Sequence, residues 1–379
     1  MFVYICNMKK IDPAEISQWH DTYYEKGVES RRVTLDQIKP YLAGLDDPFQ
    51  VHKIGESFEN RDIYKLQFGT GAIKILLWTQ MHGNESTGTK AFLDLIRLFM
   101  FPNSFDWLKQ IILKECTVHC IPVLNPDGAL AYTRVNAQNI DLNRDVIDIK
   151  AEESKVLQKI LVQVNPSYCF NLHDQRTIFS VGPGSMPATI SFLAPSVDEE
   201  RTLTEGRQET MKVIAAMNDL LKQVIPGRIG RYTDEFYPTA TGDNFEKMGH
   251  HTMLIESGHA VGDYERKQSR KFTFMALLEG LRYISQAEKE VDYRQYFDIP
   301  NNEKKYLDVI VKNITLGSEK QDLGILFIEE LKGEKVIFVP SVDKLGSLEG
   351  YNADRFIDGT ELHFIDKNDV EKWAYNHFN

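Results

Sequence analysis

Several polar side chains that can bind a metal ion or transfer a proton stand directly after apolar runs of the sequence. Four such runs, KILLWTQ, CIPVL, CFNL and TMLI, are followed by histidine, asparagine or an acidic residue. The residues at these positions are His82, Glu85, Asn125, Asp127, His173 and Glu256. In open α/β sheets, ligands bind just outside the carboxyl ends of the strands. Because a buried strand has no structural need to end in an imidazole or a carboxylate, the repeated pattern predicts one chemical site at this edge of a sheet.

His82 and Glu85 are three residues apart at a predicted strand-to-helix turn, so both side chains can face one point. His173 follows another predicted strand and can supply a third ligand. Two imidazoles and one carboxylate form a catalytic type of zinc site, in which the fourth position stays open for water. An isolated His-x-x-Glu pair has a plain alternative, a solvated helix face, and it is the other strand ends that favour the metal site.

The segment from Thr133 to Arg144 contains two arginines and three asparagines but few apolar residues. It is a poor strand or core helix, and its alternative interpretation is a solvated loop. However, a guanidinium binds a carboxylate through two parallel hydrogen bonds. Arg134, Asn143 and Arg144, if they lie near a zinc ion, would hold an anionic end of a substrate.

Alternating strands and helices must position these residues. The spacing of apolar residues predicts helices over 12–25, 34–45, 86–100, 104–115, 151–164, 199–225 and 266–288. Strands are predicted over 117–124, 167–172 and 252–256, and residues 48–80 alternate like an antiparallel hairpin. We therefore expect an α/β fold whose mixed, mostly parallel central sheet is flanked by helices.

The pattern of the sequence divides the chain into three parts. We expect an N-terminal helical segment over residues 1–46, a catalytic domain over 47–295 and a small β-rich C-terminal domain over 300–379. The last part consists of short apolar runs separated by Gly, Asp and Asn, which is typical of strands and turns. The stretch 180–198 is rich in Gly, Pro and Ser, and we expect it to be a functional loop that walls a pocket.

The composition restricts the class of protein and its partners. The 379-residue chain is 42% hydrophobic and 26% charged, which excludes intrinsic disorder, collagen and disulfide scaffolds. Its formal net charge of −11 argues against nucleic-acid binding. Because no apolar run approaches the roughly 18 residues of a membrane span, we expect no membrane partner. With only four cysteines and no signal pattern at the N-terminus, we expect a cytoplasmic protein.

Taken in order, these motifs resemble the zinc carboxypeptidases, the family of pancreatic carboxypeptidase and its bacterial and cytosolic relatives. The resemblance covers roughly residues 47–285. It is carried by IGESFENR at 54–61, HGNE at 82–85, NPDG at 125–128, Arg134 with DLNR at 141–144, NLH at 171–173, YPTATG at 237–242 and Glu256. Three of these motifs, HGNE, NPDG and DLNR, are also shared with the related succinylglutamate desuccinylases and aspartoacylases.

The resemblance implies which residues form the metal centre. His82, Glu85 and His173 would hold one zinc ion per chain, and Asp141 would hydrogen-bond His82 and fix its tautomer. Glu256 would be the general base that activates the zinc-bound water. Amide hydrolysis at neutral pH needs both groups, because zinc lowers the pKa of its water to about 7 and a positioned carboxylate carries the proton to the leaving amine.

The resemblance also implies which residues bind the substrate. Asn143 and Arg144 would bind its terminal carboxylate, and Arg134 would stabilise the oxyanion. Tyr237 would close over the substrate and donate a hydrogen bond. Because the family places this tyrosine a few residues further ahead of the catalytic glutamate, Tyr232 is the alternative.

The sequence therefore predicts a metallocarboxypeptidase, a zinc hydrolase that cleaves the C-terminal amide bond of a peptide with a free terminal carboxylate. The first alternative is a zinc-dependent N-acyl amino acid deacylase of the desuccinylase or aspartoacylase type, although the Arg134-to-Asn143 spacing and Tyr237 favour the peptidase. A second alternative is a non-catalytic peptide-binding protein on the same scaffold. That protein would lack a ligand or the base, and here each is present.

The resemblance places residues 241–244 along the pocket that receives the last side chain of the substrate. An acidic Asp243 in this pocket would favour a cationic or amine-bearing residue, such as Lys, Arg or a diaminopimelate-type residue. The alternative is that Asp243 caps the turn before Phe245. His259, three residues after Glu256, can also line the site.

Overall fold

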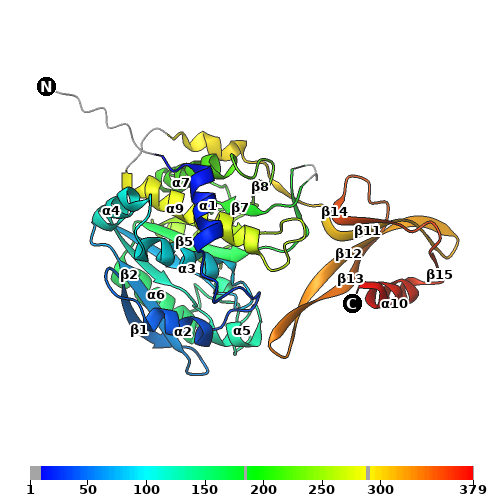
Figure 1. Ribbon diagram of the computed structural model, residues 1–379, viewed down its shortest axis with the longest axis horizontal. Helices are drawn as coiled ribbons and strands as arrows, with labels where there is room; N and C mark the ends of the chain where they lie inside the picture. Colours follow the sequence, from blue (N-terminus) through cyan, green and yellow to red (C-terminus); the bar gives the residue numbers. More distant parts are fainter. Residues whose placement is uncertain (1–9, 183–185, 287–290, 379) are drawn as a thin grey trace.

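An eight-stranded mixed sheet forms the centre of the molecule (Figure 1). The computed structural model describes residues 10–182, 186–286 and 291–378. The strands, in the order β1-β2-β4-β3-β5-β9-β7-β8, are β1 (Gln50–Glu56), β2 (Asp62–Phe68), β4 (Cys116–Ile121), β3 (Ile73–Trp78), β5 (Tyr168–Asp174), β9 (His251–Ser257), β7 (Ile190–Leu193) and β8 (Ile229–Arg231). The central strands β4, β3, β5 and β9 are parallel, whereas β2 is antiparallel to β4 and β7 is antiparallel to β9.

Helices cover both faces of this sheet. They are α1 (Pro13–Tyr23), α2 (Leu35–Ala43), α3 (Thr87–Met100), α4 (Asp106–Glu115), α5 (Pro126–Ala131), α6 (Glu152–Val164), α7 (Glu205–Leu221), α8 (Thr241–Lys247) and α9 (Lys267–Gln286), with 3-10 turns η1 (Leu142–Arg144) and η2 (Tyr293–Asp298). One apolar core joins α3, α4, α7 and α9 to one face of the sheet, and a second joins α6 to the other. Leu77 and Leu76 of β3 belong to opposite cores, which explains why the central strands are apolar without alternation. The expected α/β class is confirmed.

Capping residues fix where the helices begin. Asp12 accepts hydrogen bonds from two backbone N–H groups of α1, and Pro13 takes the first helical position. The helix predicted over 199–225 is shorter than expected, because Thr204 caps α7 by accepting from the backbone nitrogen of Arg207 at 3.1 Å. None of the helices in the described part of the chain is long and apolar enough to cross a membrane.

Two predictions about strands need correction. The hairpin predicted over 48–80 consists only of β1 and β2, because β4 lies between β2 and β3. β3 instead has parallel partners on both edges, as suits a strand whose second half is buried on both faces. The stretch 180–198 is not simply a loop, since it contains the fully buried strand β7 and the end of β6 (Phe179–Val181). Residues 183–185 of that stretch lie outside the described residues.

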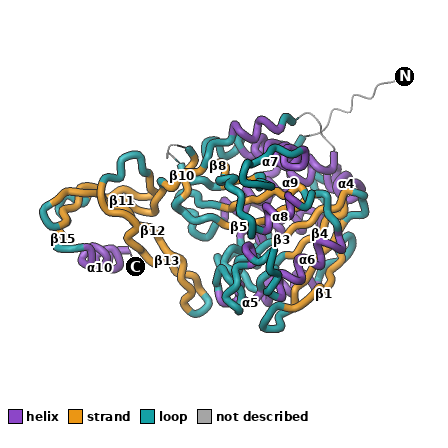
Figure 2. Tube along the Cα trace, turned by 180° about the vertical axis from the view of Figure 1, so that it is seen from behind, coloured by secondary structure: helices purple, strands orange, loops and turns teal. Residues whose placement is uncertain are grey.

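The residues after 305 form a second sheet beside the central body (Figures 1 and 2). Its strands are β11 (Tyr306–Leu316), β12 (Glu319–Lys332), β13 (Lys335–Gly346), β14 (Asn352–Asp358) and β15 (His363–Phe364), in the order β13-β12-β11-β14 with β15 on β11. β10 (Asn302–Lys304) pairs with β6 of the central body. The helix α10 (Lys367–Phe378), which the sequence analysis did not predict, packs on the second sheet. The long β12–β13 hairpin turns back toward α5 (Figures 1 and 2).

Candidate active site

The carboxyl ends of three neighbouring parallel strands carry the predicted metal ligands and base. The His82–Glu85 turn connects β3 to α3, His173 lies near the end of β5, and Glu256 lies near the end of β9. Glycine is required at position 83, because a Cβ there would lie 1.9 Å from the carbonyl carbon of Gly128. This close approach packs the turn against α5 and fixes the direction in which its side chains point.

The two histidines and Glu85 converge on one point. His82 Nδ1 lies 2.8 Å from Glu85 Oε1, His173 Nδ1 lies 2.9 Å from Glu85 Oε2, and the two Nδ1 atoms are 3.1 Å apart. All three residues are buried. Burial lowers the pKa of His173, which favours the neutral imidazole that binds metals. Although burial opposes it, the two imidazoles hold the pKa of Glu85 well below its ordinary value. Two nitrogen donors and an ionised carboxylate fit zinc.

Asp141 holds the far side of the His82 ring. Its Oδ1 lies 3.1 Å from His82 Nε2 and also accepts from the backbone nitrogen of Asn143 at 2.9 Å. A proton on Nε2 facing this carboxylate leaves the Nδ1 lone pair directed at Glu85 and His173. Burial lowers the pKa of His82, but the Glu85 carboxylate and the Asp141 contact overcome this effect and raise it to about 9. The site therefore stabilises positive charge next to Nδ1.

Glu256 lies beside the ligand group. It is the register partner of His173 on the adjacent strand, so the two side chains project from the same face of the sheet, about 5 Å apart at their origins. Its carboxylate makes no hydrogen bond within the described part of the chain. Burial, and then the negative charge of Glu85, raise the pKa of Glu256. A carboxylate with a raised pKa and no hydrogen-bond partner is suited to accepting a proton.

Arg134 reaches the ligand group from the solvent side. Its Nε donates to Asp141 Oδ2 at 3.0 Å, and its Nη1 lies 3.2 Å from His82 Nδ1 and 3.5 Å from Glu85 Oε1. The side chain is 46% exposed. The guanidinium therefore contacts His82 and Glu85 while part of it stays open to solvent.

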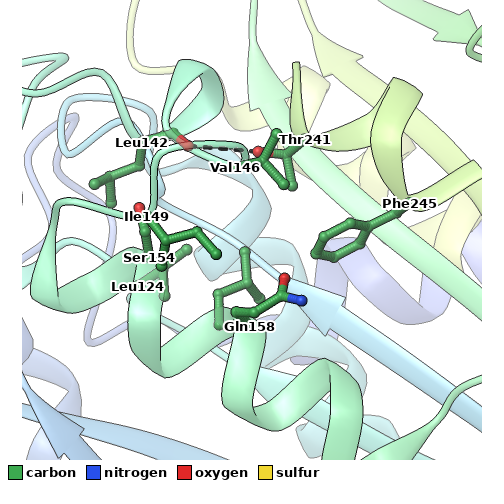
Figure 3. A pocket seen from close by; sticks show the side chains of 9 residues that line it. Leu124, Leu142, Val146, Ile149, Ser154, Gln158, Thr241 and Phe245 are labelled. Carbon is green, nitrogen blue, oxygen red and sulfur yellow. Dashed lines mark hydrogen bonds between the residues drawn. The ribbon is translucent and has the colours of Figure 1, made fainter. Parts of the chain in front are cut away.

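Asn143, Arg144 and Tyr237 lie close together, and Asn143 is hydrogen-bonded through its backbone to Asp141. Asn143 Oδ1 accepts from the backbone nitrogen of Thr241 at 3.2 Å, which joins η1 to the start of α8. The Arg144 guanidinium carbon lies 5.2 Å from the centroid of the Tyr237 ring, which is itself 45% exposed. Figure 3 shows the apolar pocket beneath this junction, where the Thr241 hydroxyl donates to the carbonyl oxygen of Leu142.

Asp243 lies under the Tyr237 loop. Its Oδ1 accepts a hydrogen bond from the backbone nitrogen of Tyr237 at 3.1 Å, and the side chain is buried. Burial raises the pKa of Asp243 to about 6. This contact ties Asp243 to the loop of Tyr237, and neither the cap of the turn before Phe245 nor the role in side-chain selection is tested, so both stay predictions.

Tyr232, the alternative closing tyrosine, directly follows β8. Its ring packs on Phe179 with 5.2 Å between centroids. Burial, and then the charge of Glu256, raise the pKa of its hydroxyl to about 12. The positive charge of Arg176 acts in the opposite direction on the same hydroxyl, so this exposed arginine, absent from every motif, also lies near the centre.

The polar residues that follow β4 make structural contacts. Asn125 caps α5 by accepting from the backbone nitrogen of Gly128 at 2.8 Å. The buried Asp127 accepts from Ser57 Oγ and from Arg61 Nη1, both at 2.6 Å. These contacts tie the β1–β2 turn to α5 and so support the His82–Glu85 turn from below.

His259 does not join the ligand group. Its Nε2 lies 2.9 Å from Asp354 Oδ2, and together with Asp308 the two residues form a separate buried cluster. Tyr264 donates to Asp308 and Tyr306 donates to Asp354, each at 2.9 Å. Because the carboxylates already accept these hydrogen bonds and others from backbone nitrogens, the cluster is a polar link between the two sheets.

Three charged residues that sequence analysis missed lie behind the strand ends. Arg266 donates to the carbonyl oxygen of Gln175, just after β5, at 2.7 Å and to that of Ser257, the last residue of β9, at 3.2 Å. The buried Arg31 forms an ion pair with the half-buried Glu329 next to the same strand ends. Their local sequences carry no motif, and only the folded chain brings them to the site.

Comparison with known proteins agrees with this geometry. Residues 43–166 match the family model described as zinc carboxypeptidase. The "Probable carboxypeptidase 2" of Trichophyton verrucosum is 27% identical over 112 residues, covering 29% of this chain and 21% of that protein. "Carboxypeptidase Z" of Gallus gallus is 30% identical over 163 residues, covering 37% and 24%. The chain thus spans about a fifth to a quarter of the length of these curated relatives.

A solved structure extends the likeness to the fold. The metallo-carboxypeptidase from Burkholderia cenocepacia matches with a TM-score of 0.54 and 15% identity, covering 69% of this chain and 71% of that chain. Identity at this level shows the fold alone. The expected resemblance to the zinc carboxypeptidases is therefore confirmed in sequence over residues 43–166 and in fold over the larger part of the chain.

Proposed function

We propose that the chain is a zinc-dependent metallocarboxypeptidase, which hydrolyses the C-terminal amide bond of a peptide. The observation that carries the proposal is the convergence of His82, Glu85 and His173, whose facing atoms are between 2.8 and 3.1 Å apart. Glu256 lies on the adjacent strand with a carboxylate that has no hydrogen-bond partner in the described chain. The match of residues 43–166 to the zinc carboxypeptidase model supports the same class.

Each side chain around the metal centre would have a separate task. Zinc, when bound, would supply a Lewis acid that polarises the scissile carbonyl and lowers the pKa of water. Glu256 would accept the proton of the attacking water and pass it to the leaving amine. Arg134 would donate to the carbonyl oxygen as negative charge develops on it, which stabilises the transition state more than the ground state.

The terminal carboxylate of the substrate would bind at Arg144 and Asn143. Arg144 Nη1 donates to the carbonyl oxygen of Asn143 at 2.8 Å, and the other N–H groups of its guanidinium make no hydrogen bond to the described residues. A guanidinium with a free edge can hold a carboxylate through two hydrogen bonds. Tyr237, stacked on Arg144 and partly exposed, would cover the bound terminus.

A deacylase of the desuccinylase or aspartoacylase type would use the same metal and base, and it remains the alternative. The partly exposed Arg134 and Tyr237 favour the peptidase, because side chains open to solvent leave room for a longer chain. We further propose a reducing, cytoplasmic setting, which the free buried thiols of Cys116, Cys120 and Cys169 support.

Two measurements test this function. Metal analysis of the purified chain should give one zinc per chain, and turnover should be higher on blocked dipeptides than on N-acetyl or N-succinyl amino acids. Glu256→Gln should keep its zinc but lose turnover by about two to four orders of magnitude, because only the proton carrier is removed. Faster turnover of N-acyl amino acids would favour the deacylase, and zinc binding without turnover of either substrate would favour the non-catalytic protein.

A further inference from the structure

The second sheet reaches the metal centre through one carboxylate. Glu329 lies on β12 of the β12–β13 hairpin, and its carboxylate contacts Arg31 and Tyr132 of the central body. On the same face of the hairpin as Glu329, the rings of Phe327 and Phe338 lie 5.7 and 5.1 Å from the ring of Tyr264. These aromatic rings form an apolar contact between the two sheets, and Glu329 lies beside it.

The buried Arg31 joins Glu329 to the end of β5. Arg31 donates from Nε and Nη2 to Glu329 Oε1 at 3.0 and 2.9 Å, and from Nη1 to Asp174 Oδ2 at 2.7 Å. The Arg31 and Asp174 side chains are only 4% and 2% exposed. A guanidinium buried between two carboxylates is costly to leave unpaired, so the loss of either carboxylate must disturb the other contact.

Arg31 contacts both segments that carry the predicted metal ligands. Its carbonyl oxygen accepts from Ser86 Oγ at 2.6 Å, directly after Glu85. Asp174 follows His173, accepts from Thr87 Oγ1 at 2.7 Å, and donates its backbone N–H to Glu85 Oε2 at 3.1 Å. A shift of Arg31 is therefore transmitted to a ligand oxygen through one residue.

The second oxygen of Glu329 reaches the segment of the predicted oxyanion arginine. Tyr132 donates its hydroxyl hydrogen to Glu329 Oε2 and lies two residues before Arg134. Tyr132 ends α5 in the left-handed conformation, with φ of 57°, so its placement sets the direction of the chain into Arg134. The Glu329 carboxylate is thus connected to three segments. Through Arg31 it reaches the segment of His82 and Glu85 and the segment of His173, and through Tyr132 it reaches the segment of Arg134.

We propose that Glu329 is a positioning residue of the metal centre, so that the second sheet is part of the catalytic apparatus and not a separate appendage. The inference rests on the proposed zinc site. Glu329 does not touch zinc or substrate; it fixes Arg31 and Tyr132, which in turn fix the ligand segments and the entry to Arg134.

The simpler interpretation is that Glu329 only docks the second sheet. The two interpretations are separable, because other contacts hold the same junction. His259 contacts Asp354 and Tyr264 donates to Asp308, both independently of Glu329. Glu329→Gln should therefore leave the sheets docked while it removes the charge that holds Arg31.

The experiment compares Glu329→Gln with Glu330→Gln in the full zinc-loaded chain. Glu330 is the next residue of β12, exposed on the opposite face, and serves as the matched control. The readouts are the rate of zinc release to a chelator well below the unfolding temperature, kcat, KM and the midpoint of thermal unfolding. For Glu329→Gln we expect zinc release to be about three- to tenfold faster, which is a smaller effect than the loss of a residue in direct contact with a metal ligand. We also expect kcat to fall while KM stays nearly unchanged. Glu330→Gln should match the wild type.

Two results would overturn the proposal. The first is a lower unfolding midpoint in Glu329→Gln with wild-type zinc release and kcat, which would show docking alone. The second concerns Tyr132→Phe, which replaces Glu329→Gln in the test if that variant does not fold. Tyr132→Phe removes one hydrogen bond to Glu329 at small steric cost, and a wild-type kcat in this variant would reject the proposal. Wild-type zinc content separates this failure from failure of the proposed function, because a chain that binds no zinc refutes the zinc site itself.

Discussion

Replacing Asp141 by Asn removes the charge behind the predicted zinc ligand His82 while keeping the size of the side chain. The carboxylate has three partners: His82 Nε2 at 3.1 Å, Arg134 Nε at 3.0 Å and the backbone nitrogen of Asn143 at 2.9 Å. Burial raises the pKa of Asp141, but His82 and Arg134 outweigh burial and hold it well below its ordinary value. The group is thus ionised at neutral pH, and the substitution removes a full negative charge.

The expected loss follows from which contacts survive. An amide oxygen at Oδ1 can still accept from Asn143 and from His82 Nε2, so the turn and the ring orientation are retained. The amide nitrogen at Oδ2 cannot accept from Arg134, and the imidazole loses the charge that makes it a stronger donor to the metal. Partners of this kind contribute about 10- to 100-fold to metal affinity, which corresponds to about 1.4 to 2.7 kcal/mol.

Competition with a zinc chelator at pH 7.5 measures this affinity. The control is Asp148→Asn, since Asp148 is exposed and, among the residues that the structure describes, forms an ion pair with Lys150 alone. We expect Asp141→Asn to bind zinc about 10- to 100-fold more weakly than the control. Equal zinc affinities of Asp141→Asn and the control would refute the inference that Asp141 supports His82 as a ligand.

Four further variants test other parts of the site. Arg144→Ala should chiefly raise KM, and amidation of the substrate terminus should abolish its difference from the wild type. Arg134→Ala should chiefly lower kcat, as expected for a contact made mainly in the transition state; steady-state kinetics that show the reverse split would exchange the two roles. Asp243→Asn should weaken any preference for peptides ending in Lys over Phe or Glu, whereas an unchanged preference in kcat/KM would leave Asp243 as a turn cap. Glu246 is buried beside Thr210 and Thr252, and burial raises its pKa from 4.5 to about 7. Between these two pH values the carboxyl group of Glu246 is protonated in the folded state and ionised in the unfolded state. Its contribution to stability therefore falls as pH rises through that window, by at most about 1.4 kcal/mol per pH unit, and Glu246→Gln should flatten this slope in denaturant titrations between pH 5 and 8.

The ligand group could be predicted from the sequence because its signal is local. His82 and Glu85 share one turn, and His173 and Glu256 each close an apolar run that can only be a buried strand. Parallel strands place their carboxyl ends on one edge, so the identity of the strands was enough to bring these side chains together. The order of the strands in the sheet was not needed. The hairpin predicted over 48–80 placed β3 beside β2, and this error did not affect the site.

The support behind the site could not be predicted, because it depends on pairs far apart in the chain. Arg31 and Glu329 are separated by 298 residues, and neither lies in a motif. A charged residue in a short polar segment or on a strand is normally a solvated side chain, and burial of this pair follows only from the docking of the β12–β13 hairpin. The buried β7 was missed for a related reason: its four residues follow a Gly- and Pro-rich stretch that resembles a loop.

The most direct test of the central claim is product analysis with a matched pair of peptides, one with a free C-terminal carboxylate and one amidated. The zinc-loaded wild type should release only the last residue of the free peptide and leave the amidated peptide intact. Glu256→Gln, with its zinc retained, should release almost nothing from either. Equal cleavage of the two peptides by the wild type, or full activity of Glu256→Gln, would contradict the account.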